Sequence, residues 1–390
     1  MKFIELFDEE TMNPLWDKIE NIPEFAALKG VLQNFDYHQE DAFEHTKYVT
    51  TEMKTYLDAV HANKKGLYYL IMISAALCHD LGKATTTYYD EKDKVYKCRN
   101  HGLAGERITR KLFYDTNPII REIICYMVRY HMNLHYVLDD EKTINDKLIF
   151  LSKGLVSIHD MLILNKCDSL GSINENQSLK DLKERWEKIE QIARDLNIYD
   201  TVYSNYKEID RNKFTIYVML GLPGSGKNYF IDNYKYLKEN NLPVISRDDI
   251  RTEIGIPGEK PFGNKEQENK VTEICEERMI EYCKKQQSFI INNTNLRRSF
   301  RRDYFELTEE YKPQIVYIFV EPNSLEDNYN RRRGMMSLDV IDRMLDNMEF
   351  PHTSECDNLI MAAKLYNKSP LSLVPSKLKD IMHWKNGKSI

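Results

Sequence analysis

Residues 214–228 read FTIYVMLGLPGSGKN, an apolar run followed at once by a glycine-rich loop and a lysine. The apolar and β-branched run favours a buried strand. The loop has the spacing G-x-x-x-x-G-K, in which glycines let backbone N–H groups turn inward around phosphate oxygens at the start of a helix. The stretch therefore predicts a strand, a phosphate-binding loop (P-loop) and a helix, which together begin an α/β domain that binds a nucleotide.

This P-loop is expected to bind ATP or another NTP together with Mg²⁺. The lysine adds a positive charge beside the β- and γ-phosphates, so Lys227 is also a candidate catalytic residue. Asn228 departs from the pattern, because Ser or Thr normally ligates Mg²⁺ at this position. Its amide oxygen replaces that hydroxyl directly or through water, or the metal is held differently. The residues expected to bind the nucleotide are Gly221, Gly224, Ser225, Gly226, Lys227 and Asn228.

Further β-rich runs follow the P-loop and alternate with helical stretches. They lie at 241–246, 287–292 and 314–320, and ECDNLI at 355–360 fits a terminal strand. This alternation predicts a mostly parallel sheet with helices on both faces. The polar stretch at 199–213 marks the best domain boundary. We therefore expect a first domain over residues 1–205 and an α/β P-loop phosphotransferase domain over residues 206–390.

Residues 40–200, in contrast, have the pattern of one helix after another. Apolar residues recur at helical spacing through 66–78, 119–130 and 147–167. Residues 178–197 form an amphipathic pattern that is typical of a helix packed on its own domain. The expected fold class is an all-α helical domain followed by an α/β domain.

Several histidines and aspartates in the helical half have side chains that can ligate a metal. His79 and Asp80 follow the apolar run LYYLIMISAALC, and such a pair at a helix end can reach one divalent ion. Two imidazoles and two carboxylates leave positions open on an octahedral ion, so this donor set suits Mn, Fe, Co or Ni at least as well as Zn. The candidate ligands are His45, His79, Asp80, His101, His131 and Asp168.

The order H…HD…H…H…D, with HDLGK and NHGLAGE around it, resembles the HD phosphohydrolase superfamily over roughly residues 40–170. The resemblance implies a first metal ion on His45, His79, Asp80 and Asp168. His101 and His131 match the ligands of a second ion in two-metal members, with Asp80 as the bridge. Lys83 matches a lysine that contacts the substrate phosphate. A divalent ion lowers the pKa of bound water, and a second cation or this lysine offsets charge on the phosphate.

Three other histidines fall outside this matched set. His135, one turn beyond His131, either faces the substrate or is solvated. His38 and His61 have no supporting context in the sequence and are expected at the surface.

The element SRDDIR at 246–251 resembles the polynucleotide kinase branch of P-loop phosphotransferases. The resemblance implies that Asp248 is the general base for an attacking 5′-hydroxyl and that Arg251 binds the phosphate of the acceptor strand. Asp249 is expected to cap the helix start, where Asp is favoured.

Two later elements resemble parts of the same kinases. NNTN at 292–295 resembles their D-T-N element, with Asn293 where the family often has Asp. The stretch 328–344 resembles their arginine lid, which implies that Arg331 and Arg333 close over the transferred phosphoryl group. The arginines at 297, 298, 301 and 302 form a basic cluster that either meets a polynucleotide backbone or is a solvated helix face.

The combination resembles the bacterial HD–polynucleotide kinase RNA end-healing enzymes over roughly residues 40–360. This resemblance implies removal of a 2′,3′-cyclic, 2′- or 3′-phosphate by the first domain and phosphorylation of a 5′-hydroxyl by the second, on RNA or DNA ends. The sequence contains no K-x-D-G ligase element, so sealing is expected from a separate ligase. Two alternatives stay open: an HD nucleotidase fused to a nucleoside-type kinase, and a nucleotide-sensing regulatory protein.

Composition limits these possibilities only weakly. The net charge is −6, and residues 211–390 carry 28 basic against 26 acidic side chains, so overall charge does not decide nucleic-acid binding. The seven cysteines are an odd number without a CxxC pair, which favours reduced thiols. No apolar run is long enough for a membrane span and the first residues do not resemble a signal peptide. A cytoplasmic protein without membrane contact is expected.

Overall fold

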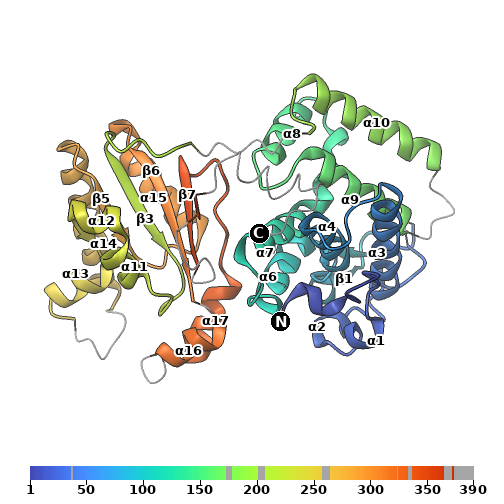
Figure 1. Cartoon of the computed structure of the whole chain (residues 1–390), viewed down its shortest axis with the longest axis horizontal. Coiled ribbons are helices and arrows are strands. Elements are labelled where there is room, and N and C mark those ends of the chain that lie inside the picture. Colours follow the sequence, from blue (N-terminus) through green and yellow to red (C-terminus); the bar gives the residue numbers. More distant parts are fainter. Residues whose placement is uncertain are drawn as a thin grey trace. The chain divides into compact units, whose positions relative to one another are not determined.

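The computed structural model describes residues 1–36, 38–172, 178–200, 207–256, 264–322, 324–332, 336–363 and 371–372. Through residue 200 these residues form one compact unit, and from residue 207 onward they form a second (Figure 1). The expected two-domain architecture is thereby confirmed, while the boundary predicted between 205 and 206 lies outside the described residues. Within the described residues, no helix combines the length and apolar character that a membrane crossing requires.

The first unit is helical, as the sequence predicts, with one added hairpin. The hairpin pairs β1 (Thr87–Asp90) with β2 (Val95–Cys98) in antiparallel fashion. The helices are η1 (Phe3–Leu6), α1 (Trp16–Ile19), α2 (Pro23–Ala26), α3 (Ala42–Ala59), α4 (Leu67–Cys78), α5 (Lys83–Thr86), α6 (His101–Leu112), α7 (Pro118–Tyr130), η2 (His131–Leu134), η3 (Val137–Asp139), α8 (Ile144–Ser152), α9 (Ile158–Leu170) and α10 (Leu179–Asp195).

The apolar helix α4 lies at the centre of this unit. It packs against α3, α7 and α9, and α6 packs against α7. The helical pattern at 147–167 forms two helices, because Ser157 caps α9 through its Oγ, which accepts from the N–H of Asp160. Between them, a side chain at Gly154 would overlap the Tyr126 ring. The packing brings together the start of α3, the ends of α4 and α7, the start of α6 and the last part of α9, and these are the segments that carry the candidate ligands.

The second unit is an α/β domain with a mostly parallel sheet, which confirms the expected fold class. The sheet order is β4-β5-β3-β6-β7-β8; all neighbouring strands are parallel except the last pair. The strands are β3 (Thr215–Leu220), β4 (Val244–Ile245), β5 (Phe289–Asn292), β6 (Gln314–Glu321), β7 (Asn358–Ala363) and β8 (Leu371–Ser372). The helices are α11 (Lys227–Asn233), α12 (Lys235–Asn240), α13 (Arg247–Glu253), α14 (Lys265–Lys284), α15 (Arg298–Thr308), η4 (Glu309–Tyr311), α16 (Leu325–Arg332) and α17 (Leu338–Asp346).

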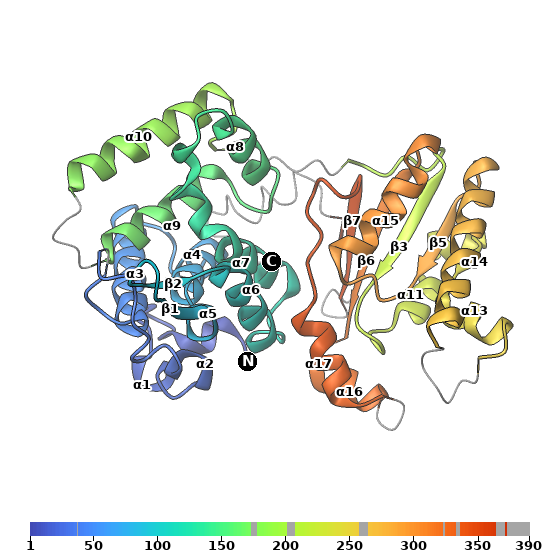
Figure 2. The same cartoon turned by 180° about the vertical axis from the view of Figure 1, so that it is seen from behind.

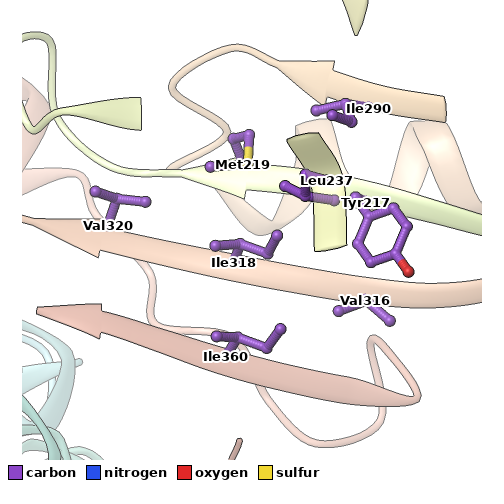
Figure 3. Packing of buried hydrophobic residues seen from close by; sticks show 8 residues of the cluster. All are labelled: Tyr217, Met219, Leu237, Ile290, Val316, Ile318, Val320 and Ile360. Atoms are coloured by element: carbon purple, nitrogen blue, oxygen red, sulfur yellow. The ribbon is translucent and has the colours of Figure 1, made fainter. Parts of the chain in front are cut away.

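Helices cover both faces of this sheet. On one face, side chains of four parallel strands form an apolar layer with Leu237 of α12 (Figure 3). On the other face, the Arg301 guanidinium of α15 lies over the Tyr317 ring, and Tyr282 of α14 contacts Phe289. Because neighbouring residues of a strand point to opposite faces, β3 and β6 are buried on both sides. The loops at their carboxyl ends are therefore held on a rigid base, where ligands of open α/β sheets bind.

Candidate metal centre and phosphate-binding site

Four candidate ligands meet at one point in the first unit. The Nε2 atom of His45, on α3, lies 2.9 Å from Oδ1 of Asp168, on α9, and 3.3 Å from Nε2 of His79, at the end of α4. Oδ2 of Asp80 lies 3.2 Å from the His79 Nε2 and 3.5 Å from the His45 Nε2. All four residues are buried. The four residues, which are far apart in the sequence, thus form a compact group of two imidazoles and two carboxylates.

The other oxygen of Asp80 faces a second group. Its Oδ1 lies 3.4 Å from Nε2 of His101 and 3.7 Å from Nε2 of His131. The two imidazole nitrogens are 3.0 Å apart. The residues therefore form two clusters of the kind that can hold a metal ion, one with His45, His79 and Asp168 and one with Asp80, His101 and His131. Asp80 lies between them with one oxygen toward each.

Backbone carbonyls fix the orientation of three of these imidazoles. Nδ1 of His79, His101 and His131 donates to the carbonyl oxygens of Ala76, Cys98 and Val128, at 2.8, 2.7 and 2.7 Å. A neutral imidazole with its proton on Nδ1 presents a lone pair on Nε2. Donation from the other ring nitrogen is the usual support of a metal-ligating histidine.

The second cluster fits a divalent cation for a simple electrostatic reason. The Nε2 atoms of His101 and His131 and Oδ1 of Asp80 are three acceptors that face one another. The described residues offer that carboxylate oxygen no hydrogen-bond donor. Two ligands bound at right angles with bonds of about 2.1 Å lie about 3 Å apart, which is close to the separation of the two histidines. Both the spacing and the missing donor suit a cation, and the nitrogen–oxygen donor set suits a transition metal.

The pKa values of the groups in this centre are shifted in different directions. Burial lowers the pKa of His79, but the carboxylates of Asp80 and Asp168 outweigh burial and raise it to about 10. Burial and the neighbouring histidines lower the pKa of His131 to about 3. Burial would raise the pKa of Asp80, yet the positive charges of His79 and Lys83 hold it well below its ordinary range. The centre is therefore anionic at its carboxylates and binds a cation in competition with protons.

Glycines explain how the segments of the motif come so close. A Cβ at Gly82, in HDLGK, would lie 2.0 Å from the carbonyl oxygen of His101. A Cβ at Gly102 would lie 2.5 Å from the carbonyl oxygen of Arg129. Since contacts below 3.0 Å do not occur for real Cβ atoms, glycine at both positions lets α6 approach the turn after α4 and the end of α7. This approach brings His101 beside His131.

A cavity of about 960 Å³ opens beside the two clusters. Lys83 lines it, and its Nζ lies 2.6 Å from Oδ2 of Asp80 and 2.5 Å from Oε1 of Gln33. Burial lowers the pKa of Lys83, but the Asp80 carboxylate outweighs burial and raises it. His135 also lines the cavity and donates from Nε2 to Oδ2 of Asp168 at 2.9 Å. His135 is thus turned toward the centre rather than solvated.

Two further residues at this centre have no signal in the sequence. Nδ1 of His38 lies 2.9 Å from Oε1 of Glu40, which is 3.4 Å from Nδ1 of His45. Only 16% of the His38 side chain is exposed, so the expectation that His38 lies at the surface is wrong. The loop before α3 brings Glu40 against His45, a contact that no local spacing predicts. This carboxylate orients the imidazole from its far side.

In the second unit, the P-loop adopts the backbone that its glycines permit. Gly221, Gly224 and Gly226 have φ of 148°, 84° and 101°, the region that favours glycine. A Cβ at Gly221 would lie 2.4 Å from the Val320 carbonyl oxygen. Lys227 begins α11 and donates from Nζ to the carbonyl oxygens of Gly221 and Leu222 at 2.9 and 3.0 Å. The loop is a preformed nest at a helix start.

The NNTN element supports this loop from the neighbouring strand. Nδ2 of Asn292 donates to Oδ1 of Asn228 at 2.9 Å, so the residue that replaces the usual hydroxyl is tied to the end of β5. Asn293 accepts from the backbone N–H of Arg247 at 3.0 Å, and Asn295 donates to the carbonyl oxygen of Met219 at 2.7 Å. Asn293 therefore connects the P-loop side of the sheet to the start of α13.

Helix α13 carries the candidate base. The Asp248 side chain is 88% exposed, and its Oδ1 accepts from Nη1 of Arg251 at 2.6 Å. Arg251 is also held by Glu268 of α14, at 2.8 and 2.9 Å. Arg251 thus connects Glu268, which the sequence did not single out, to Asp248. The helix is capped by Ser246, whose Oγ accepts from the N–H of Asp249 at 3.3 Å, so the expectation that Asp249 caps it is wrong.

The arginine-rich elements divide into two kinds. Arg331, on α16, donates to the carbonyl oxygen of Gly224 at 3.3 Å and so reaches the P-loop, while Arg333 lies outside the described residues. Asn328 ties the same helix to the carbonyl oxygen of Pro223 at 2.8 Å. Arg301 is buried, pairs with Glu355 and donates to three backbone carbonyls. Arg301 is therefore a structural residue. It neither contacts a polynucleotide backbone nor belongs to a solvated helix face.

Comparison with known proteins agrees with this division of the chain. Residues 43–155 match the model of the HD domain family, and residues 216–351 match the model of an AAA domain family. The chain therefore fuses an HD phosphohydrolase-like domain to a P-loop, kinase-like domain. The first matched segment contains every candidate metal ligand except Asp168, and the second contains the P-loop and Asp248.

Three curated relatives are all named multifunctional CCA protein. The protein of Pasteurella multocida is 32% identical over 116 residues, which are 29% of this chain and 26% of the relative. The protein of Mannheimia succiniciproducens is 26% identical over 193 residues, 48% of this chain and 44% of the relative. That of Paraburkholderia phytofirmans is 46% identical over 120 residues, 30% and 26% of the two chains. The chain thus spans less than half the length of these relatives.

Proposed function

We propose that this chain is a bifunctional enzyme that heals nucleic-acid ends, with RNA as the expected substrate. Its HD domain would remove a 2′,3′-cyclic, 2′- or 3′-phosphate, and its P-loop domain would phosphorylate a 5′-hydroxyl. One observation carries the proposal: a single chain contains both kinds of site. The first is a buried His/Asp centre beside an open cavity. The second is a P-loop that lies, like the exposed Asp248, at the carboxyl ends of the parallel strands.

In the HD domain, His45, His79 and Asp168 would hold one divalent transition metal ion, with Asp80 as a shared ligand. His101 and His131 would hold a second ion where two are bound. Such ions lower the pKa of water and offset the charge of a phosphate. Manganese, iron, cobalt, nickel and zinc all accept this donor set.

The other residues of the centre act on the substrate side. Lys83 keeps its charge beside Asp80 and faces the cavity, so it would pair with a non-bridging oxygen of the terminal phosphate. His135 holds the second oxygen of Asp168 and thereby orients that carboxylate. Because the cavity of about 960 Å³ is much larger than a phosphate, it leaves room for the attached nucleotide.

In the P-loop domain, Lys227 and the loop N–H groups would bind the phosphates of ATP or another NTP with Mg²⁺. Asp248 would accept the proton of the attacking 5′-hydroxyl. Arg251, held by Glu268, would orient this carboxylate as well as face the acceptor strand. Arg331 and Arg333 would neutralise charge on the transferred phosphoryl group. The product ends, a 5′-phosphate and a 3′-hydroxyl, are those that a separate nucleic-acid ligase joins.

The kinase activity is tested with the purified chain, radiolabelled ATP and a single-stranded oligonucleotide that ends in a 5′-hydroxyl. We expect label on the oligonucleotide. Label on a nucleoside but never on an oligonucleotide would instead favour the pair of small-molecule enzymes. ATP binding without transfer to either acceptor would favour a nucleotide-sensing regulatory protein.

The phosphohydrolase activity is tested on an oligonucleotide with a 2′,3′-cyclic phosphate, after chelation and addition of Mn, Co, Ni or Mg in turn. Asp80→Ala should be the most damaging change, because Asp80 faces both clusters, and His135→Ala should be milder. Kinase activity, measured in the same preparations, should survive both changes. Full hydrolysis by the chelated wild-type protein, or by Asp80→Ala, would show that the HD assignment is wrong.

A further inference from the structure

The β1–β2 hairpin of the HD domain has one face directed toward the cavity. Its register pairs Thr87 with Cys98 and Tyr89 with Tyr96. Paired residues lie on the same face of a two-stranded sheet, so these four side chains form one face and Tyr88 lies on the other. Thr87, Tyr96 and Cys98 line the cavity, together with Lys97, while Tyr89 lies beyond its lining. The hairpin lies beside α5, which carries Lys83 (Figure 2).

The residue pairs of this cavity-side face lie at increasing distance from the metal centre. The pair of Thr87 and Cys98 comes first, because Nδ1 of His101 donates to the carbonyl oxygen of Cys98. The pair of Tyr89 and Tyr96 follows two residues further along the strands. Two residues of a strand span roughly 6.8 Å, so the second pair lies about that far outward from the first.

Three aromatic rings meet at the outer end of this face. The Tyr96 ring lies 5.2 Å from that of Tyr89 and 6.0 Å from that of Phe35, at interplanar angles of 64° and 83°. Phe35 is 62% exposed and Tyr89 is 43% exposed. Because the contacts are edge-to-face, the rings do not cover one another in parallel stacks. Solvent therefore reaches large apolar surfaces beside Tyr96, which lines the cavity.

The charges around these rings favour an anionic ligand. Arg99, the residue after β2, is exposed and lines the cavity between the hairpin and His101. The acidic side chains of the hairpin lie at its turn or on the opposite face, where Lys97 pairs with Asp90 at 2.8 Å and with Asp93. The cavity-side face therefore combines aromatic rings with a cation, the combination that binds single-stranded nucleic acid.

We propose that Phe35, Tyr89 and Tyr96 form a stacking platform for the bases of a single-stranded nucleic acid whose 3′ end lies in the metal-centre cavity. The proposal rests on the proposed function of the HD domain and deepens it, because it makes a polynucleotide, rather than a free nucleotide, the substrate that this domain prefers. A mononucleotide held at the metal centre gains nothing from rings two residues further out. An oligonucleotide contacts them with its penultimate bases.

The test compares two matched tyrosines on the same strand. Tyr89→Ala removes a ring from the platform, while Tyr88→Ala removes one of nearly equal exposure, 40%, from the opposite face. Phe35→Ala removes a platform ring from a separate segment. Binding is measured by fluorescence anisotropy of a single-stranded RNA of about ten nucleotides with a 3′-phosphate. Fluorescein on its 5′ end removes the hydroxyl that the kinase domain takes. Hydrolysis of a 2′,3′-cyclic mononucleotide is measured in parallel.

We expect Tyr89→Ala and Phe35→Ala each to weaken RNA binding roughly 5- to 150-fold, the range expected for one base–aromatic stack. Tyr88→Ala should bind like the wild type, and all three variants should hydrolyse the mononucleotide normally. Binding by Tyr89→Ala equal to that of Tyr88→Ala would overturn the proposal, as would an equal loss on RNA and mononucleotide. If the wild type hydrolyses no terminal phosphate, the proposed function fails, and the anisotropy comparison still decides whether the platform binds RNA.

Discussion

Replacing Gly82 by Ala gives a sharp test of the metal centre, because the change is small and its steric effect is large. Gly82 has φ −71° and ψ −18°, a helical backbone that alanine adopts without strain. The added Cβ, however, would lie 2.0 Å from the carbonyl oxygen of His101. Since real Cβ contacts stay above 3.0 Å, the start of α6 must move away by about 1 Å.

That movement falls directly on the second cluster. His101 begins α6, and its Nε2 lies 3.0 Å from that of His131 and 3.4 Å from Oδ1 of Asp80. A displacement of about 1 Å breaks this spacing, and misplacement by that amount can cost about 100-fold in rate. The first cluster does not involve α6. Overpacking costs about 1–3 kcal/mol, partly offset by about 0.5–1 kcal/mol because alanine replaces glycine in a helical segment, so the domain should still fold.

The assay is metal content after dialysis, together with kcat/KM on a 2′,3′-cyclic-phosphate oligonucleotide. We expect Gly82→Ala to lose one bound ion and about 100-fold in kcat/KM, with kinase activity unchanged. Gly105→Ala is the matched control, because its Cβ would lie 3.0 Å from the Val128 side chain, 3.3 Å from the backbone N of Gly82 and 3.6 Å from the carbonyl oxygen of His79, and none of these contacts is below 3.0 Å. Its loss should stay below about tenfold. The reasoning is refuted if Gly82→Ala retains the metal content and kcat/KM of the wild type.

Four further outcomes are expected. Lys227→Ala and Asp248→Ala should each abolish 5′-phosphorylation and leave phosphohydrolase activity nearly intact, because both residues lie outside the HD domain. Equal loss of both activities in a folded Asp248→Ala protein would count against two separate sites. Asn228→Ser should preserve or raise kinase activity with Mg²⁺ or Mn²⁺, measured as label transferred to a 5′-hydroxyl end, whereas complete loss would show that the amide has a role that a hydroxyl cannot fill. Burial lowers the pKa of His79 but the neighbouring carboxylates raise it to about 10, so metal binding at pH 7 should release about one proton. The metal affinity should rise as pH approaches that value. Calorimetry in buffers of different ionisation enthalpy measures the proton release, and a pH-independent affinity would contradict the prediction. Glu122→Gln should destabilise the HD domain by about 3–5 kcal/mol in thermal unfolding, because it removes the buried carboxylate that pairs with both Arg110 and Arg121. A loss below about 1 kcal/mol would be inconsistent with that network.

Much of the fold could be predicted because its signals are local. The run at 214–220 forms β3 and the run at 314–320 forms β6, since a long apolar and β-branched segment has few stable alternatives to a buried strand. The β1–β2 hairpin was missed within a region expected to be helical throughout. Its signal was present in the sequence, because aromatic and β-branched residues flank a charged turn, but two short strands gain their stability from pairing and packing rather than from propensity.

The candidate metal centre shows where prediction from sequence stops. The motif in the sequence identifies the candidate ligands, and the structure brings all six of these residues into two adjoining clusters. The roles of Glu40, Gln33 and His38 have no counterpart in any spacing. Gln33 reaches Lys83, 50 residues away, while His38 pairs with Glu40 inside the loop and Glu40 approaches His45 on α3. These contacts depend on how the loop before α3 packs.

The order of residues along the chain sets the chemistry available at each position. It supplies nitrogen and oxygen donors in order along the helices, glycines where segments must approach closely, and a lysine after the phosphate-binding loop. The tertiary structure alone decided which side chains use that chemistry. Arg301 belongs to a basic run, yet Glu355, 54 residues away, neutralises it inside the protein. Arg251 is held by Glu268 rather than left in solvent. Spacing along a chain fixes which face of a helix or strand a residue occupies, but the partner that its charge meets comes from another element, and only packing brings the two together.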